Sequence, residues 1–134
     1  MIITCENRAM YVDIGGFDTW KALCATVSVR LNKMRDSIPL AFRFLSTGKC
    51  ASADCLETAR QFNTVRDLLS KYPPNQLVYD AADLNKKAPW GDKISPVITS
   101  CANYLTTGDG RDLLAEIVRI LSYSAYTGQA VELE

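Results

Sequence analysis

The spacing of apolar residues changes abruptly at Gly15-Gly16, and this change constrains the fold more than any other feature of the chain. Residues 9–14 alternate apolar and polar side chains, with the period of a strand that buries one face. Residues 18–34 instead carry apolar side chains at helical spacing, and Asp18 is placed to cap that helix. With the β-branched stretch at 2–5, the pattern predicts an N-terminal β-hairpin followed by a helix.

The rest of the chain is predicted to contain both strands and helices. Strands are predicted at 40–46, 76–80 and 130–133, with the last one returning to the edge of the sheet, and helices at 52–72 (capped by Ser52), at 95–105 and from a cap at Asp109 to Gly128. Residues 81–94 show no period and predict a long loop. We therefore expect an α+β fold, a single domain with a mostly antiparallel sheet covered by about four helices.

Length and composition set the limits of this domain. The 134 residues are 48% hydrophobic and 22% charged, which is typical of one globular domain. We expect that domain to span 1–132, with 133–134 a possible tag scar. The chain has no apolar run of roughly 18 residues and no signal-peptide pattern, so a cytoplasmic protein without membrane contact is expected.

The charges are balanced overall but divided between the two halves of the chain. Residues 1–75 carry ten Lys/Arg against seven Asp/Glu, a balance of +3, whereas residues 76–134 carry five against eight, a balance of −3. A general nucleic-acid binder would show a strong basic stripe, so direct nucleic-acid binding is not expected. An acidic patch facing a basic partner is compatible with this division.

The chain contains no histidine, which removes the usual general base and the commonest zinc ligand. Five scattered cysteines favour buried reduced thiols over disulfides or a metal site, and the Cys50/Cys55 pair lacks further zinc ligands. Residues 46–50 lack the anchors of a phosphate loop, and residues 108–112 lack the ligands of a calcium loop. We expect no cofactor, no metal and no enzymatic activity.

Two further features admit two interpretations. Asp80, Asp83, Asp92, Asp109 and Asp112 are close in sequence, so they are either solvated surface groups or a source of a general acid/base pair. Trp90 lies in the predicted loop beside Pro89 and Gly91, where it either plugs the core or serves as an exposed binding anchor.

Residues 89–91, 94–102 and 108–114, read as PWG, ISPVITSCA and GDGRDLL, resemble a family of small immunity proteins of bacterial polymorphic-toxin and contact-dependent growth-inhibition systems. The resemblance covers residues 89–125 and contains no catalytic signature. It implies a non-enzymatic protein that binds the C-terminal domain of a cognate toxin, often a nuclease, and blocks it.

This expectation assigns the binding surface to the second half of the chain. The residues predicted to contact the toxin are Asp80, Asp83, Trp90, Asp92, Asp109 and Asp112. Two alternatives remain open: a small carboxylate-using enzyme or ligand-binding protein, which requires a deep pocket with at least two acids, and a homo-oligomeric scaffold, which requires a large apolar patch. The sequence leaves self-association undecided.

Overall fold

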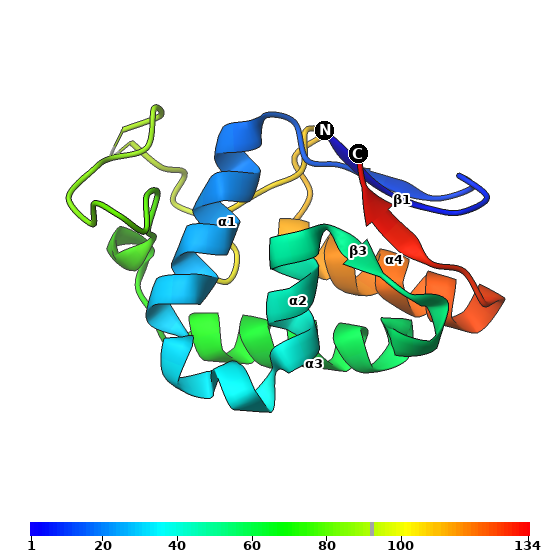
Figure 1. Ribbon diagram of the computed structural model, residues 1–134. Helices are drawn as coiled ribbons and strands as arrows, with labels where there is room; N and C mark the ends of the chain where they lie inside the picture. Colours follow the sequence, from blue (N-terminus) through cyan, green and yellow to red (C-terminus); the bar gives the residue numbers. More distant parts are fainter. Residues whose placement is uncertain (92) are drawn as a thin grey trace.

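A computed structural model describes residues 1–91 and 93–134 and confirms the α+β class (Figure 1). In chain order the elements are β1 (Ile2–Cys5), β2 (Tyr11–Asp13), α1 (Phe17–Arg30), α2 (Pro39–Thr47), β3 (Lys49–Cys50), α3 (Cys55–Leu69), α4 (Leu113–Thr127) and β4 (Val131–Leu133), with 3₁₀ helices η1 (Asn32–Ser37), η2 (Ser52–Asp54) and η3 (Pro74–Gln76).

The four strands form one antiparallel sheet in the order β2-β1-β4-β3. The predicted hairpin is confirmed, since Ile3 pairs with Val12. The prediction that the last strand lies at the sheet edge is wrong, because β4 pairs with β1 on one side and with β3 on the other. Leu133 pairs with Ile3, and the main chain of Glu134 exchanges hydrogen bonds with that of Ile2, so 133–134 continue the sheet.

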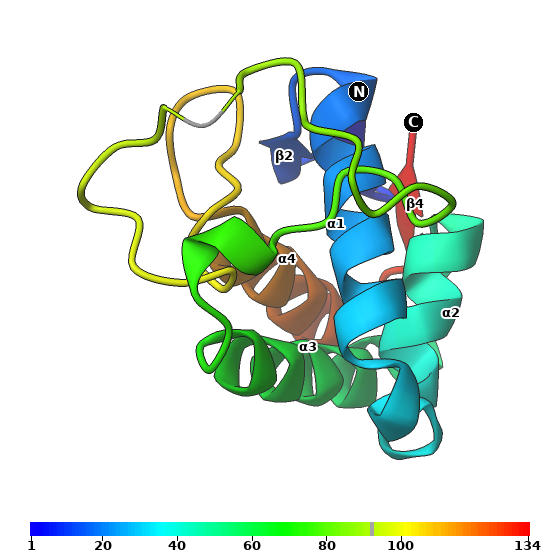
Figure 2. The ribbon, with the colours of Figure 1, turned by 90° about the vertical axis from the view of Figure 1, so that its left-hand side faces the viewer.

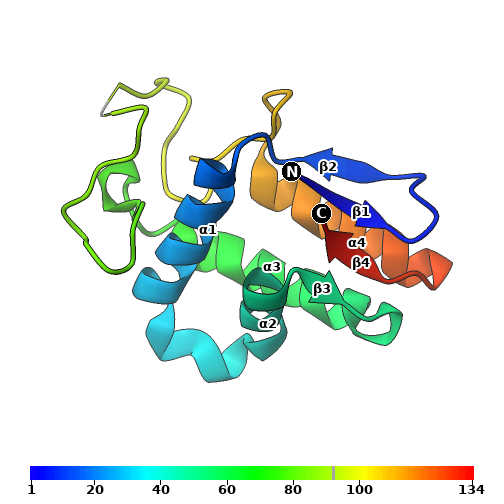
Figure 3. The same ribbon diagram turned by 45° about the horizontal axis from the view of Figure 1, so that its top comes forward.

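The sheet has one covered and one open face. Val12 and Ile14 are buried whereas Tyr11 and Asp13 are exposed, as the alternation predicts. The covered face packs against α4 (Figure 3). The open face carries exposed Tyr11 and Glu132.

Helix α1 is shorter than the sequence predicts. It ends at Arg30, and the exposed 3₁₀ helix η1 replaces its expected last turn. This change of pitch leaves Leu31 and Ile38 buried on either side of η1. Asp18 makes no capping hydrogen bond, since the capping position is Gly16, so the predicted cap is wrong.

The predicted strand at 40–46 is wrong, because these residues lie in helix α2. Pro39 occupies its first turn, where a missing N–H has no cost, and the buried positions Ala41, Phe42, Phe44 and Leu45 follow a helical spacing. The short apolar run fits either period, and a tertiary contact decides between them. Gln61 Oε1 of α3 accepts hydrogen bonds from the N–H groups of Leu40 (2.7 Å) and Ala41 (3.1 Å), which lie in the first turn of α2.

Helix α3 confirms the predicted helix between 52 and 72, with different ends. Its regular part begins at Cys55 after η2, and Ser52 makes no side-chain capping bond, so the predicted cap is wrong. Cys55, Ala59, Phe62 and Leu69 are buried as expected, whereas Leu56 is half exposed.

Residues 76–80 do not form the predicted strand. The main-chain N–H of Val78 donates to Thr26 Oγ1 and the Thr26 hydroxyl donates to the Val78 carbonyl, both at 3.0 Å. A side chain of α1 therefore satisfies the backbone groups that a neighbouring strand would otherwise pair.

The predicted helix at 95–105 is also wrong, because this segment consists of turns. Asn103 Oδ1 accepts from the N–H groups of Thr99 and Ser100, and Asn103 Nδ2 donates to the Val97 carbonyl. Side-chain bonds of this kind compete with the helical ladder. The main chain of Cys101 donates instead to Tyr72, which ties the segment to the end of α3.

Helix α4 is capped by Asp112 rather than by Asp109 as predicted. Asp112 Oδ1 accepts from the Ala115 N–H at 3.3 Å. Gly128 ends the helix in the left-handed conformation (φ 71°), as predicted.

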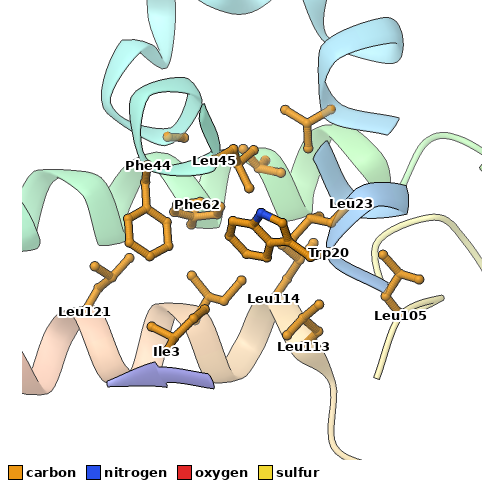
Figure 4. Packing of buried hydrophobic residues seen from close by; sticks show 14 of the residues in the cluster. Ile3, Trp20, Leu23, Phe44, Leu45, Phe62, Leu105, Leu113, Leu114 and Leu121 are labelled. Atoms are coloured by element: carbon orange, nitrogen blue, oxygen red, sulfur yellow. The ribbon is translucent and has the colours of Figure 1, made fainter. Parts of the chain in front are cut away.

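The core lies between α1, α2, α3, α4 and the sheet (Figure 4). Phe44 forms edge-to-face contacts with Trp20 (ring centroids 6.2 Å apart) and Phe62 (5.9 Å). No helix in the described part of the chain is long and apolar enough to cross a bilayer.

Candidate functional site

Trp90 lies at the surface between Tyr79 and Tyr104. The segment that leads to it from η3 passes α1 near Val78 and Asp80 (Figure 2). The Trp90 indole N–H donates to the Tyr104 hydroxyl at 3.0 Å, and the Trp90 ring makes an edge-to-face contact with Tyr79 (centroids 6.2 Å apart). The residue remains 37% exposed. Trp90 is therefore outside the core, and two neighbouring rings hold it in place.

A hollow of about 440 Å³ opens beside this indole. Its apolar lining includes Leu77, Tyr79, Leu84, Trp90, Ile94 and Tyr104. The ammonium of Lys21 lies 4.7 Å from the centre of the Tyr79 ring, so the protein's own cation already occupies that aromatic face.

Asp80 follows Tyr79 and lies near two lysines. Its Oδ2 is 4.0 Å from the Nζ of Lys21 and 3.9 Å from that of Lys86. The Tyr79 hydroxyl donates a hydrogen bond to Asp18 Oδ1, and this bond raises the pKa of Tyr79 above its ordinary value. Asp18, predicted only as a helix cap, therefore binds the side chain of Tyr79, the residue that precedes Asp80.

Asp83 lies in the same segment as Asp80. Its carboxylate accepts from the Asn85 N–H at 3.1 Å in an exposed turn. Asp92, also predicted to contact the partner, lies outside the described residues.

The turn at 107–111 holds Asp109 in a fixed orientation. The Thr107 hydroxyl donates to Asp109 Oδ1, and Arg111 Nε lies 3.2 Å from Asp109 Oδ2. The Thr107 bond, followed by the Arg111 charge, lowers the pKa of Asp109. The carboxylate is thus ionised over the whole neutral range.

This turn is attached to the junction between β2 and α1. The Gly108 N–H donates to the Asp13 carbonyl at 2.7 Å, and the Asp13 carboxylate accepts from the Gly15 N–H at 2.8 Å. A Cβ on Gly108 would lie 2.8 Å from the Asp13 carboxylate, so any larger residue there would displace that carboxylate. Asp13 and Asp109 therefore lie at adjoining positions, and both belong to the residues around one hollow of about 250 Å³.

Two pairs of carboxylates belong to the candidate site, Asp13 with Asp109 around one hollow and Asp18 with Asp80 near Tyr79, and we call these four residues the acidic edge. Asp80 and Asp109 carry intramolecular ion pairs, whereas Asp13 and Asp18 form none with the described residues. Asp13 could have been found from the sequence, because it occupies an exposed position of the alternating strand. No local sequence pattern predicts the hydrogen bond between Asp18 and Tyr79, because the two residues are distant in the chain.

Asp112 lies apart from this edge. It caps α4 and lines a different hollow, together with Arg66 and Asn103. Of the predicted residues, Asp80, Asp83 and Trp90 lie in one segment, Asp109 lies near Asp13, and Asp112 caps α4.

The opposite end of α1 has the opposite charge. Asp18 is in its first turn, whereas Arg30 is in its last turn and Lys33 and Arg35 follow in η1 (Figure 1). A helix of 14 residues is about 21 Å long, so these charges are well separated. Helix α1 therefore carries an acidic group at its start and a basic group at its end, as its dipole favours.

The family model described as "Immunity protein 70" matches residues 5–133. The chain belongs to the immunity protein 70 family. The match extends well beyond the segment 89–125 that carried the sequence resemblance, and it confirms an immunity protein family. Membership assigns an immunity function to the chain and implies a toxin protein as its partner. Neither a curated protein nor a solved structure matches the chain.

Proposed function

We propose that this immunity protein binds the C-terminal domain of a cognate toxin, a nuclease, and blocks it without chemistry of its own. The family supports the immunity role, and the acidic edge supports the choice of a nuclease. The contact between Gly108 and Asp13 carries the proposal, because it holds the turn of Asp109 against the strand end that leads into α1 and Asp18.

A nuclease needs a basic cleft to hold phosphates, and an acidic surface can occupy such a cleft. Electrostatic complementarity of this kind raises the association rate and disfavours binding to other proteins. The fixed geometry of the acidic edge adds to this effect: Gly15 donates to Asp13, Tyr79 to Asp18 and Thr107 to Asp109. Carboxylates that are already oriented lose little entropy when a partner binds.

Trp90 supplies the apolar part of the proposed contact. Tryptophans at the centre of an interface often carry a large share of the binding energy. Trp90 is exposed by about a third and immobilised by Tyr79 and Tyr104, so its ring is presented in a defined orientation. Asp83 lies in the same segment and adds a further exposed carboxylate to the proposed contact.

The test is affinity for the purified toxin domain encoded beside this chain, together with rescue of cells that express the toxin. The double variant Asp80→Lys/Asp109→Lys places like charges against the basic cleft, and it should weaken binding by several kcal/mol, or on the order of 10³-fold or more in Kd. Rescue should be lost in parallel.

The matched control is Asp36→Lys/Asp67→Lys, which makes the same change in net charge at two exposed acids of η1 and α3. It should leave affinity and rescue close to those of the unmodified protein. Equal weakening by the two double variants would show that net charge, and not the acidic edge, governs binding. Retained affinity in both would remove the edge from the interface.

A further inference from the structure

Cys50 and Cys55 bring their thiols together where the sheet meets helix α3. Cys50 ends β3 and Cys55 begins α3, and the Cys55 thiol lies close enough to shift the pKa of Cys50. Both also lie near the same main-chain carbonyl, since the Sγ atoms are 3.6 Å (Cys50) and 3.4 Å (Cys55) from the oxygen of Ala51. The other three cysteines have no comparable thiol partner among the described residues.

Cys50 is accessible to a small reagent from the outside. It lines a hollow of about 410 Å³ together with Thr4, Ala51, Ala130 and Val131, and it retains 6% of its exposure. Cys55 is fully buried behind it. Cys5 lines the same hollow but is only 1% exposed, so Cys50 is the most exposed thiol that a small oxidant meets there.

The environment also favours the thiolate at Cys50. The hydrogen bond from Cys55 lowers the pKa of Cys50 to about 7 from the ordinary 9.0, whereas the same contact and burial raise that of Cys55. Burial raises the pKa of Cys24 and of Cys101 to about 11, which disfavours their thiolates. Cys50 thus combines access, nucleophilicity and a neighbouring thiol.

We infer that Cys50 and Cys55 form a peroxide-reactive pair that closes reversibly to a disulfide. The Cys50 thiolate attacks one peroxide oxygen, the O–O bond breaks, and the released hydroxide takes up a proton to leave as water, which leaves a sulfenic acid on Cys50. The Cys55 sulfur then attacks the Cys50 sulfur: the S–S bond forms, the S–O bond breaks, and the hydroxyl leaves as a second water with the Cys55 proton. Two thiols are oxidised and one hydrogen peroxide is reduced.

Peptide mapping of the full chain after titration with hydrogen peroxide tests this inference. Both cysteines lie in the tryptic peptide 50–60, which should become lighter by two hydrogens. Cleavage before Asp54 should then give two fragments that stay joined until dithiothreitol is added. Cys5, Cys24 and Cys101 should still react with a maleimide.

Single substitutions separate the two roles. Cys55→Ser should stop the reaction at a sulfenic acid on Cys50 that dimedone traps, and Cys50→Ser should leave Cys55 unmodified. Cys101→Ser is the matched control and should cross-link like the unmodified chain. A bond between Cys5 and Cys50, or oxidation of Cys24 or Cys101 before Cys50, would overturn the inference. Mapping of the unmodified chain decides the matter even where a variant fails to fold.

Discussion

The Trp90 indole N–H donates to the Tyr104 hydroxyl across 3.0 Å, and this bond fixes an exposed tryptophan at the surface of the molecule. The two residues are 14 positions apart in one long irregular segment. The bond therefore orders the ring and closes this segment on itself.

Replacement of Trp90 should weaken toxin binding while the fold persists. Trp90→Ala should cost at least about 2 kcal/mol of binding free energy, because the ring is a pre-ordered anchor. Tyr104→Phe keeps the second ring and removes only the acceptor, so it should cost about 0.5–1.5 kcal/mol. Isothermal titration calorimetry measures both values, and circular dichroism confirms the fold. Unchanged affinity in Trp90→Ala would place the interface elsewhere.

Gln61→Ala should destabilise the protein by about 1–3 kcal/mol. The change leaves the N–H groups of Leu40 and Ala41 without their acceptor in a partly buried site. Urea unfolding gives the difference in the free energy of unfolding. Asn63→Ala on the exposed face of the same helix is the control and should stay within about 0.5 kcal/mol. Equal effects of the two changes would contradict a capping role of Gln61.

Gly108→Ala should destabilise the turn that carries Asp109. The new Cβ would lie 2.8 Å from the Asp13 carboxylate, which Gly15 already holds, so the expected cost is about 1 kcal/mol. The same substitution in an Asp13→Ala background should cost much less, since the crowding carboxylate is gone. A double-mutant cycle measured by chemical unfolding gives this coupling. Additive effects would show that the crowding has no energetic consequence.

Asp109 should contribute stability that disappears in acid. The pKa of Asp109 in the folded protein lies below its ordinary value. At about pH 4 this carboxyl therefore binds more protons in the unfolded chain than in the folded one. The contribution is complete above the unfolded pKa and is lost as the pH falls through the folded pKa. The stability difference between the unmodified protein and Asp109→Asn should therefore shrink on acidification.

Thr107 identifies the source of this shift. Thr107→Val removes the hydroxyl that donates to Asp109 and should raise the pKa of that carboxyl, as followed by NMR of its side-chain carbon. Thr107→Ser keeps a hydroxyl and should leave the pKa low. A low pKa in the valine variant would assign the shift to Arg111 instead.

Two errors in the predicted fold, the strands at 40–46 and 76–80, have a common physical origin. Residues 40–46 suit a strand or a helix by their apolar content alone, and the acceptor that decides for a helix, Gln61, is 20 positions away. Residues 76–80 have the composition of a strand, but Thr26 of α1 takes their hydrogen bonds. In both segments a residue distant in sequence satisfies the backbone.

The candidate site was predictable in part for the same reason. Composition indicated that the second half of the chain is acidic, and loop position singled out Trp90. The contribution of Asp13 and Asp18, from the opposite half, depends on contacts with Gly108 and Tyr79 that no local pattern encodes.

The sequence by itself determined the features that depend on neighbouring residues: the N-terminal hairpin, the buried stripe of α3, and the end of α4 at Gly128. Periodicity and the conformational freedom of glycine act within a few residues, so they can be read along the chain. Tertiary structure decided the helical state of α2, the interior place of β4 and the assembly of the acidic edge. Those outcomes depend on hydrogen bonds between distant residues, and these exist only once the chain has packed.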